Sequence, residues 1–291
     1  MPFTLLLAAL AATAAGDDSL QARILERIQQ VPGARVSVAY QELTRPADTL
    51  YLRADTAYHA ASTMKVPVMI EAFRQSDAGT LPLDRADTLW NRFASIVDGS
   101  PYSLNASDDS DSTVYQLVGQ PVPMRELIER MITHSSNLAT NAVIDRVGAK
   151  AVQRTANALG ASGMTVLRGV EDQKAYDRGL SNTTTARALA NLMAAIERGQ
   201  AASPASSDSM RAILLRQAFN DEIPAGLPAG TRVAHKTGSI TGILHDAAVV
   251  YPADGKPYVL VVLTGNIPDG AVATALIADI SRLVYAHHQR D

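Results

Sequence analysis

A serine and a lysine three residues apart, Ser62 and Lys65, are the first residues in this sequence whose types and spacing suit catalysis. They precede an apolar run at 66–70, so we expect the first turn of a buried helix, where residues three apart share a face. A serine hydroxyl becomes a good nucleophile when an adjacent base takes its proton. A desolvated lysine can be that base, because burial lowers the pKa of an amine. Taken alone, this spacing is equally consistent with a chance match that has no catalytic role.

Two further short motifs follow in the chain, one at a predicted helix junction and one at the end of a predicted strand. They are Ser135-Ser136-Asn137 and Lys236-Thr237-Gly238-Ser239. Ser-x-x-Lys, Ser-Asp-Asn and Lys-Thr-Gly form the motif set of class A β-lactamases and penicillin-binding proteins. With the stretches 121–141 and 245–252, which are also familiar from that family, the sequence resembles the serine β-lactamase and penicillin-recognising peptidase superfamily, and class A most of all.

The resemblance implies a covalent mechanism at Ser62, which attacks the carbonyl carbon of an amide or strained lactam while Lys65 acts as general base. Ser135 is expected to relay a proton to the leaving nitrogen. Backbone N–H groups of Ser62 and Ser239, the latter beyond a strand end, are expected to bind the oxyanion, and such a donor is typically worth ~3 kcal/mol of barrier. The residues expected to bind substrate are Asn137, Lys236, Thr237, Gly238 and Ser239.

The resemblance also implies an Ω loop at about 167–182, with Glu171 as the base that activates the deacylating water. Ala175 stands where the family carries an asparagine that helps to hold that water. A solvated loop acid is the alternative interpretation of Glu171. Asn141 is expected to contact this loop, and Asn182 takes the place of the aspartate that commonly closes it.

Two further features depart from the class A pattern. With Asn182 at the loop end, Arg168 is expected to pair with Asp172 or Asp177 instead. Ser136 replaces an aspartate, which removes a structural carboxylate.

No arginine that would pair with a substrate carboxylate stands near Lys-Thr-Gly, where Leu244 and His245 occupy the strand region. Arg232, four residues before Lys236, is a candidate substitute. The histidines near the motifs are expected to pack or to cap, and these are His59, His134 and His245.

Composition excludes several function classes. The 291 residues carry a net charge of -3, and no basic stripe is present, which argues against a nucleic-acid partner. The chain has no cysteine, so disulfides and thiol chemistry are excluded, and no metal-ligand spacing or cofactor motif is found. The acidic stretch 107–112 is predicted to be an exposed loop rather than a calcium site.

The first fifteen residues resemble a secretory signal peptide, with an apolar run over 3–12 and small residues before Gly16. An unstructured start is the alternative, since the segment lacks a Lys or Arg at its beginning. The run is too short to span a bilayer, and no later segment qualifies. We therefore expect a secreted, periplasmic protein that is soluble and monomeric.

The hydrophobic periodicity predicts an α/β (α+β) fold with an antiparallel five-stranded sheet, flanked by N- and C-terminal helices, and an inserted all-α domain. The predicted strands are 35–40, 49–53, 231–238, 243–251 and 258–264. The expected domains are a discontinuous α/β domain at 16–78 and 218–291 and an all-α domain at 79–217. A site is expected in the cleft between them.

These observations predict a class A-like serine β-lactamase that needs no cofactor and acts on a small-molecule β-lactam or a peptidoglycan-like substrate. Two alternatives keep the fold and the acylation step: a D-Ala-D-Ala peptidase or serine esterase, and an acylation-only penicillin-binding protein. A catalytically silent scaffold is a third alternative, against which the three intact motifs argue.

Overall fold

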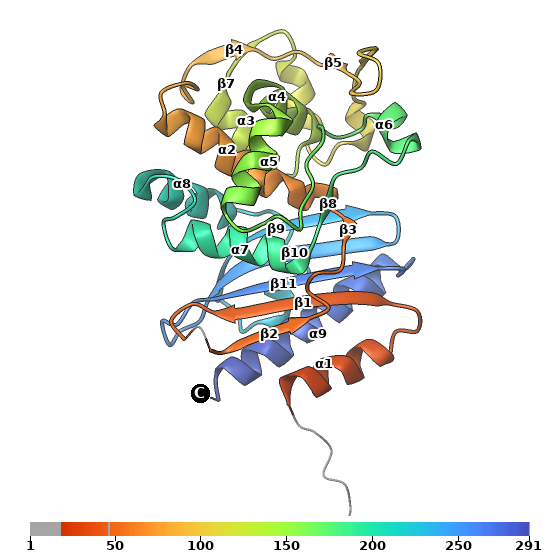
Figure 1. The fold of residues 1–291 in the computed structure, drawn as a ribbon, viewed down its shortest axis with the longest axis vertical. Coiled ribbons are helices and arrows are strands. Elements are labelled where there is room, and N and C mark those ends of the chain that lie inside the picture. Colours follow the sequence, from red (N-terminus) through yellow and green to blue (C-terminus); the bar gives the residue numbers. More distant parts are fainter. Residues whose placement is uncertain (1–18, 46, 291) are drawn as a thin grey trace, which may run out of the picture.

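The computed structural model describes residues 19–45 and 47–290, so the predicted signal peptide lies outside the described residues. Five strands form one antiparallel sheet in the order β2-β1-β11-β10-β9 (Figure 1). The strands are β1 (Arg35–Glu42), β2 (Thr49–Leu52), β9 (Arg232–Ile240), β10 (Ile243–Tyr251) and β11 (Tyr258–Gly265). The predicted five-stranded antiparallel sheet is therefore confirmed, and it joins strands from both ends of the chain.

The central strand β11 explains why the sheet is covered on both faces. All eight of its residues are buried, and alternate side chains enter two different cores. Val261 and its neighbours at 259 and 263 pack toward the helical half, whereas Tyr258, Leu260 and Val262 pack toward the terminal helices. An unbroken apolar strand of this kind indicates burial on both sides.

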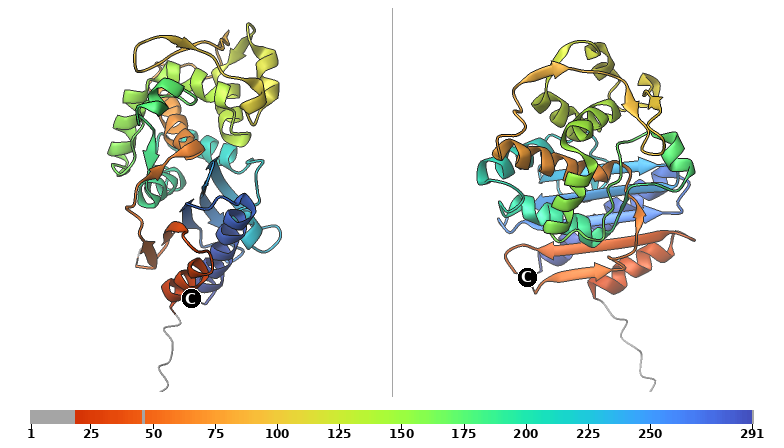
Figure 2. Two further views of the ribbon diagram at one scale, coloured as in Figure 1. Left: turned by 90° about the vertical axis from the view of Figure 1, so that its right-hand side faces the viewer. Right: turned by 45° about the horizontal axis from the view of Figure 1, so that its top comes forward.

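The terminal helices α1 (Leu20–Gln29) and α9 (Gly270–His288) cover one face of the sheet. They lie side by side, and the Arg27 guanidinium bonds the Asp279 carboxylate at 2.7 Å. Two turned views show this helix pair at the end of the molecule away from the helical half (Figure 2). The predicted flanking by N- and C-terminal helices is confirmed.

Helix α7 (Ala186–Glu197) packs on the other face of the sheet, and the remaining helices stand beyond it. They are α2 (Lys65–Asp77), α3 (Met124–Thr133), α4 (Asn137–Val147), α5 (Ala149–Ala158), α6 (Gln173–Asp177) and α8 (Pro204–Leu214). The first nine residues of α2 are buried, so this helix forms the centre of the helical half.

The insert also contains short strands that the expectation of an all-α domain missed. Within it, β4 (Ala86–Thr88) pairs with β7 (Pro121–Pro123), and β5 (Phe93–Ala94) pairs with β6 (Pro101–Tyr102), whereas β8 (Thr183–Thr184) pairs with β3 (Tyr58–His59), which precedes the insert. Four 3₁₀ turns complete the described fold: η1 (Ala61–Met64), η2 (Ala106–Asp108), η3 (Ser112–Leu117) and η4 (Pro224–Gly226). Strands of two or three residues carry too little periodicity to be read from sequence.

Among the helices of the described residues, none combines the length and apolarity that crossing a membrane requires.

Candidate active site

Ser62 lies on η1, a 3₁₀ turn that leads directly into α2 at Lys65. The prediction of an α-helical first turn is therefore wrong in detail, although the serine and lysine still lie one turn apart. The turn begins at Ala61, whose φ of 44° is a left-handed conformation that is uncommon for a residue with a side chain. This strained start sets η1 against strand β9.

Gly238 on β9 permits that close approach. A Cβ atom added to Gly238 would lie 3.0 Å from both the Ser62 and the Thr63 backbone nitrogens. Since these are backbone atoms, they cannot move aside as a side chain would. The glycine therefore brings the backbone of β9 next to the N–H of the nucleophilic serine.

Ser239 was expected beyond the strand end. It lies within β9, which continues to Ile240, and it pairs in register with Leu244 of β10. The predicted strand ended at 238, two residues before the end of β9, because the residues at 237–239 do not continue the apolar alternation. The backbone at Ser239 is consequently held by the sheet rather than by a loop.

Lys65 is fully buried and its amine has three hydrogen-bond partners. Its Nζ donates to the backbone oxygen of Ser135 at 2.6 Å and to Asn137 Oδ1 at 2.8 Å, and it lies 3.2 Å from Ser135 Oγ. A neutral amine retains two N–H donors, which suffice for the two carbonyl acceptors. The lone pair then remains for a hydroxyl proton.

Ser135 stands between two lysines. Lys236 Nζ donates to Ser135 Oγ at 3.0 Å, and the same hydroxyl lies 3.2 Å from Lys65 Nζ. Ser135 has φ 57°, a strained conformation for a non-glycine residue that costs on the order of 1–3 kcal/mol. This conformation places its hydroxyl and its carbonyl oxygen toward the lysines at once.

Burial lowers the pKa of the Lys65 amine well below its usual value, and the charge of Lys236 lowers it further, while Asp109 and Glu171 act in the opposite direction. Burial likewise lowers the pKa of Lys236 to about 7, against the opposing effect of Asp246 and Glu222. The neutral form of Lys236 is therefore accessible near neutral pH, and burial favours the neutral form of Lys65 as well.

Glu171 completes a chain of contacts that starts at Lys65. Asn137 accepts from Lys65 and donates from Nδ2 to Glu171 Oε1 at 2.7 Å. Burial raises the pKa of the Glu171 carboxyl, partly offset by the Asn137 hydrogen bond. The backbone at Glu171 has φ 60°, a second strained position in the site. One amide side chain thus connects the expected acylation base with the expected deacylation base.

Asn141 fixes the loop beside Glu171. It accepts from the Val170 N–H at 2.6 Å and donates to the Val170 carbonyl at 3.0 Å. Gly169 allows this contact, because an added Cβ would lie 2.2 Å from the Asn141 oxygen. The Ω loop is therefore attached to α4 by a paired amide contact next to the candidate base.

Asn182 closes the neck of the loop. It accepts from the Leu167 N–H at 2.8 Å and donates to the Arg168 carbonyl at 2.9 Å. The Arg168 guanidinium donates to the carbonyls of Leu180 and Gly169. An amide at position 182 thus bonds one N–H and one carbonyl of the facing segment, which a carboxylate could not do.

The expected ion pair from Arg168 to Asp172 or Asp177 is absent among the described residues. Asp172 instead accepts from Ser95 Oγ and from the Ile96 N–H, both at 2.9 Å, and it caps α6. Asp177 accepts from Gln173 within α6. Both carboxylates thus serve local capping and packing.

Asp109 is a functional residue that the sequence prediction missed. The stretch 107–112 was expected to be exposed, yet Asp109 and Asp111 are only 8% and 6% exposed. Asp109 Oδ2 accepts from the backbone N–H groups of Asn137 and Leu138 at 2.9 Å each, and from the Tyr115 hydroxyl at 3.2 Å. A carboxylate at the start of α4 is also favoured by the helix dipole. Asp109 thus provides a carboxylate next to the position at which Ser136 replaces the aspartate of the family motif.

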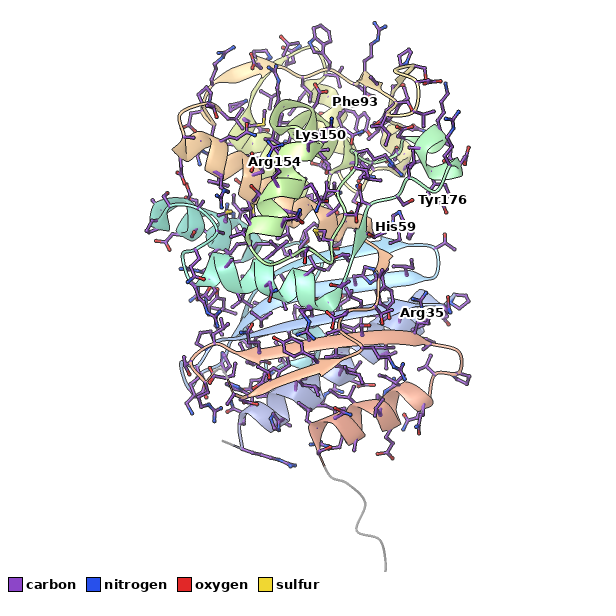
Figure 3. All side chains as sticks on the ribbon, viewed as in Figure 1. Arg35, His59, Phe93, Lys150, Arg154 and Tyr176 are labelled. Atoms are coloured by element: carbon purple, nitrogen blue, oxygen red, sulfur yellow. The ribbon has the colours of Figure 1, made fainter. Side chains whose placement is uncertain are left out.

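Two cavities flank Ser62 and share Ser62, Asn137 and Ser239. The Ω-loop cavity, of about 320 Å³, is bordered by Glu171, Tyr176 and Ile240 among others. The rings of Tyr176 and His59 meet edge-on at its rim, with centroids 6.4 Å apart (Figure 3).

The second cavity, of about 310 Å³, is bordered by Ser135, Thr237 and Glu222, and we call it the Glu222 cavity. Ser135 lines only this second cavity of the two. The proton-relay serine therefore faces one side of the nucleophile and Glu171 the other.

The candidate substitute for a carboxylate-binding arginine is wrong. Arg232 stacks on the Tyr251 ring, 5.4 Å from its centroid, near the far end of β9, and it lines neither cavity. His245 is buried, and its ring nitrogens lie 2.8 and 3.0 Å from the carbonyl oxygens of Leu244 and His59. Four strand residues separate Arg232 from Lys236 by about 13 Å, which is too far for a shared ligand group.

A buried histidine–aspartate contact behind β9 was also missed. His235 Nδ1 lies 3.0 Å from Asp246 Oδ1, and both side chains are fully buried. Asp246 also accepts from the Ile223 N–H at 3.1 Å. Within the described chain, no group of three His, Cys, Asp or Glu side chains is placed to hold a metal ion.

Such a sheet and helical half, with a serine, two buried lysines and a bridging serine at their junction, form the architecture of β-lactamases and penicillin-binding proteins. The chain belongs to the Beta-lactamase enzyme family, whose family model matches residues 19–288.

A β-lactamase of Streptomyces albus G is 27% identical over 267 residues, covering 90% of this chain and 82% of that protein. A β-lactamase of Bacillus amyloliquefaciens is 30% identical over 241 residues, covering 81% and 74%.

Solved structures agree with this membership. A variant of PBP-A held as an acyl-enzyme complex with penicillin G is 30% identical to this chain, with a TM-score of 0.79 over 94% of this chain and 97% of that one. A β-lactamase from Sphaerobacter thermophilus is 26% identical, with a TM-score of 0.75 and coverage of 94% and 97%. At the level of the family, the relatives support β-lactam hydrolysis.

Proposed function

We propose that this chain is a serine β-lactamase that forms an acyl-enzyme on Ser62. The observation that carries the proposal is the Ser135 hydroxyl, held between the amines of Lys65 and Lys236 at 3.2 and 3.0 Å. This arrangement offers a path for one proton from the nucleophile to a leaving nitrogen. A proton transfer by a positioned side chain contributes typically 10²–10⁴-fold to a rate.

Acylation proceeds with neutral Lys65 as the base. Its amine takes the Ser62 proton while Oγ attacks the carbonyl carbon, and the oxyanion is stabilised by the N–H groups of Ser62 and Ser239. The C–N bond then breaks, and the leaving nitrogen takes a proton from Ser135, which regains one from Lys65. The close packing at Gly238 supports this step, since it brings β9 against the Ser62 nitrogen.

Deacylation uses Glu171 as the base for a water molecule in the Ω-loop cavity. The carboxylate borders that cavity, and its position is fixed by Asn137 and by the Asn141 contact to the preceding residue. A raised pKa brings the carboxyl nearer to the working pH, which favours general base catalysis. The ester is then cleaved and Ser62 is released.

One observation favours a second candidate, an acylation-only protein or a peptidase of the same fold. Ala175, at the position expected for a water-holding asparagine, is fully buried in α6 and offers no polar side chain. Glu171 alone then orients the water. The similarity to PBP-A, solved as a penicillin G acyl-enzyme, is consistent with a long-lived adduct. The second candidate predicts acylation without turnover of β-lactams.

The proposal extends to the setting of the protein. The apolar start over 3–12 supports export to the periplasm, and the proposal includes a soluble, monomeric enzyme. Cleavage before Gly16 is checked by the mass of the protein secreted on expression.

Intact-mass spectrometry with a penicillin, beside turnover of a chromogenic cephalosporin, tests the function. We expect wild type to turn over the cephalosporin and Ser62→Ala to form no adduct. Glu171→Gln keeps an oxygen to accept from Asn137 and should accumulate the adduct that wild type clears. Asp177→Asn, on the same loop, is the matched control. Equal clearance by wild type and Glu171→Gln would remove Glu171 from the mechanism, and cleavage of a D-Ala-D-Ala peptide without lactam turnover would move the function to the peptidase.

A further inference from the structure

The Glu222 cavity has an acidic wall. Three carboxylate side chains line it opposite the catalytic groups, and they are Asp108, Asp221 and Glu222. Neither an arginine nor a lysine side chain appears among its lining residues in the described structure. A cavity lined by one sign of charge concentrates ligands of the opposite sign.

Glu222 is the member of this wall that lacks a partner. Its side chain is more than nine-tenths buried, at 7% exposed, and its Oε2 atom has no hydrogen-bond partner among the described residues. Buried carboxylate oxygens are normally paired, because removing them from water without compensation is costly. The unpaired oxygen is itself covered, while the residue lines the cavity, so a cation in the cavity would offset this uncompensated charge across the wall rather than by direct contact.

The nearby basic side chains already have partners. Lys236 is fully buried and donates to Ser135 Oγ and to the Thr237 carbonyl. His235 is bound to Asp246. The segment that carries Glu222 is also fixed, since the Ile223 N–H donates to Asp246 and the Ile223 carbonyl accepts from Ser281. Neither the side chains nor the backbone can easily rearrange to neutralise the carboxylate.

Geometry assigns this cavity to the leaving part of the substrate. Ser135 gives its proton to the leaving nitrogen in the proposed mechanism, and Ser135 lines the Glu222 cavity but not the Ω-loop cavity. The acyl part then occupies the side of Glu171 and Tyr176. Substituents carried by the leaving amine therefore lie against the acidic wall.

We propose that the Glu222 cavity is a cation-accepting subsite, so that the preferred substrates are amides or lactams whose leaving amine portion carries an ammonium or pyridinium group. The inference rests on the proposed function. In the step concerned, a Ser62 Oγ–carbon bond forms, the C–N bond breaks, and the leaving nitrogen takes the Ser135 proton. An open-chain amide then releases an amine that bears the cation, whereas in a lactam the amine and its cation stay attached to the acyl-enzyme through the opened ring.

A β-lactam also carries its own carboxylate, which Thr237 and Ser239 can bind by hydrogen bonds. Both residues border the same cavity as the three acids. The acidic wall repels that carboxylate, and a cationic substituent beyond it on the substrate offsets this repulsion. Asp108 and Asp221 are exposed to solvent, which weakens their contributions to this effect relative to that of the buried Glu222.

Two cephalosporins with the same thienylacetamido side chain provide the test, one with a pyridiniummethyl group at C3 and the other with a neutral acetoxymethyl group. The measured quantity is the ratio of their kcat/KM values for acylation of Ser62. We expect this ratio to fall about tenfold in the triple variant Asp108→Asn/Asp221→Asn/Glu222→Gln. The control Glu26→Gln/Asp145→Asn/Asp208→Asn changes net charge equally, away from the cavity, and should leave the ratio unchanged.

A second measurement needs no variant, because the ratio in wild type should decrease as ionic strength rises. Acylation with a ratio that neither the cavity variant nor salt alters would overturn the subsite while leaving the proposed function intact. A ratio that rises in the cavity variant would also overturn it, since Glu222 would then act as a protonated donor toward an anion. If neither compound acylates Ser62, the proposed function fails and the subsite with it.

Discussion

Asp109→Asn tests whether a carboxylate outside the three motifs holds the catalytic end of α4. In the native site, Asp109 Oδ2 accepts from the N–H groups of Asn137 and Leu138, and Oδ1 accepts from the N–H of Asp111 at 3.0 Å. Asparagine keeps one accepting oxygen but places an NH₂ group against the Asp111 N–H. The helix terminus also loses its charge.

The expected magnitude follows from these contacts. Losing a hydrogen bond to a charged acceptor and the charge at a helix N-terminus amounts to about 2 kcal/mol in the free energy of unfolding. For a chain of this size, that lowers Tm by about 3–4 °C. Thermal unfolding followed by circular dichroism measures this shift. The substitution conserves side-chain volume, so a larger loss is not expected.

The catalytic readout separates positioning from mere stability. Asp109 raises the pKa of Lys65, so its neutralisation should lower that pKa further. Neutral Lys65 would then persist to lower pH, and the acid limb of the acylation pH profile should move toward lower pH. Rapid-quench mass spectrometry of the Ser62 adduct with a penicillin measures this profile.

Asp111→Asn is the matched control, because Asp111 lies in the same loop and is equally buried but bonds Arg130 and Thr113 instead of α4. It should lower Tm without moving the acid limb. If Asp109→Asn leaves both the limb and the acylation rate at the wild-type values, the carboxylate has no part in organising the site.

Three further outcomes are expected. Gly238→Ala should slow acylation by about 10²-fold, because its Cβ would displace the Ser62 N–H; the rate of adduct formation checks this, and an unimpaired rate would refute the close-approach argument. Asn141→Ala should slow release of the adduct more than its formation, because the Val170 contact beside Glu171 is lost; equal slowing of both steps would contradict it. The cationic-to-neutral cephalosporin ratio should fall as pH decreases through about 7. Burial and Asp246 raise the pKa of Glu222 to about 7, so over that range Glu222 becomes neutral while Lys236 becomes charged. Asp221 and His235 also face Glu222. A ratio that is independent of pH from 6 to 8 would exclude Glu222 and Lys236 as the cause.

The sequence predicted the sheet well because its strands alternate or are wholly apolar, as β1 and β11 show. The motif residues Ser62, Lys65, Ser135 and Lys236 were found because their spacing matches a known set, and the structure brings them together. Their catalytic roles stay predictions. The features that could be predicted are encoded either by a periodic pattern of side chains or by a short motif of neighbouring residues.

What was missed depends on contacts between distant segments. Asp109 lies 28 residues from Asn137, in a run of polar residues that is typical of a solvated loop, so nothing local marks it as a helix cap. Glu222 and the His235–Asp246 pair likewise depend on burial by other elements. Arg232 failed as a candidate because each strand residue adds about 3.3 Å, so four residues place it too far from Lys236. The alternation of faces shows only that the two side chains share a face of the sheet.

The pairing of β1 with β11 has a consequence for how the chain folds. Arg35 lies opposite Gly265, so this ladder joins segments about 230 residues apart. Closing a loop of that length costs about 5 kcal/mol of chain entropy before any of the ladder is formed. The apolar side chains of β1 therefore lack their native neighbour until nearly the whole chain is available, and folding should be slow and limited by this late closure. A chain truncated before β11 would leave β1 with only β2 beside it, and we expect it to aggregate rather than to form a stable half.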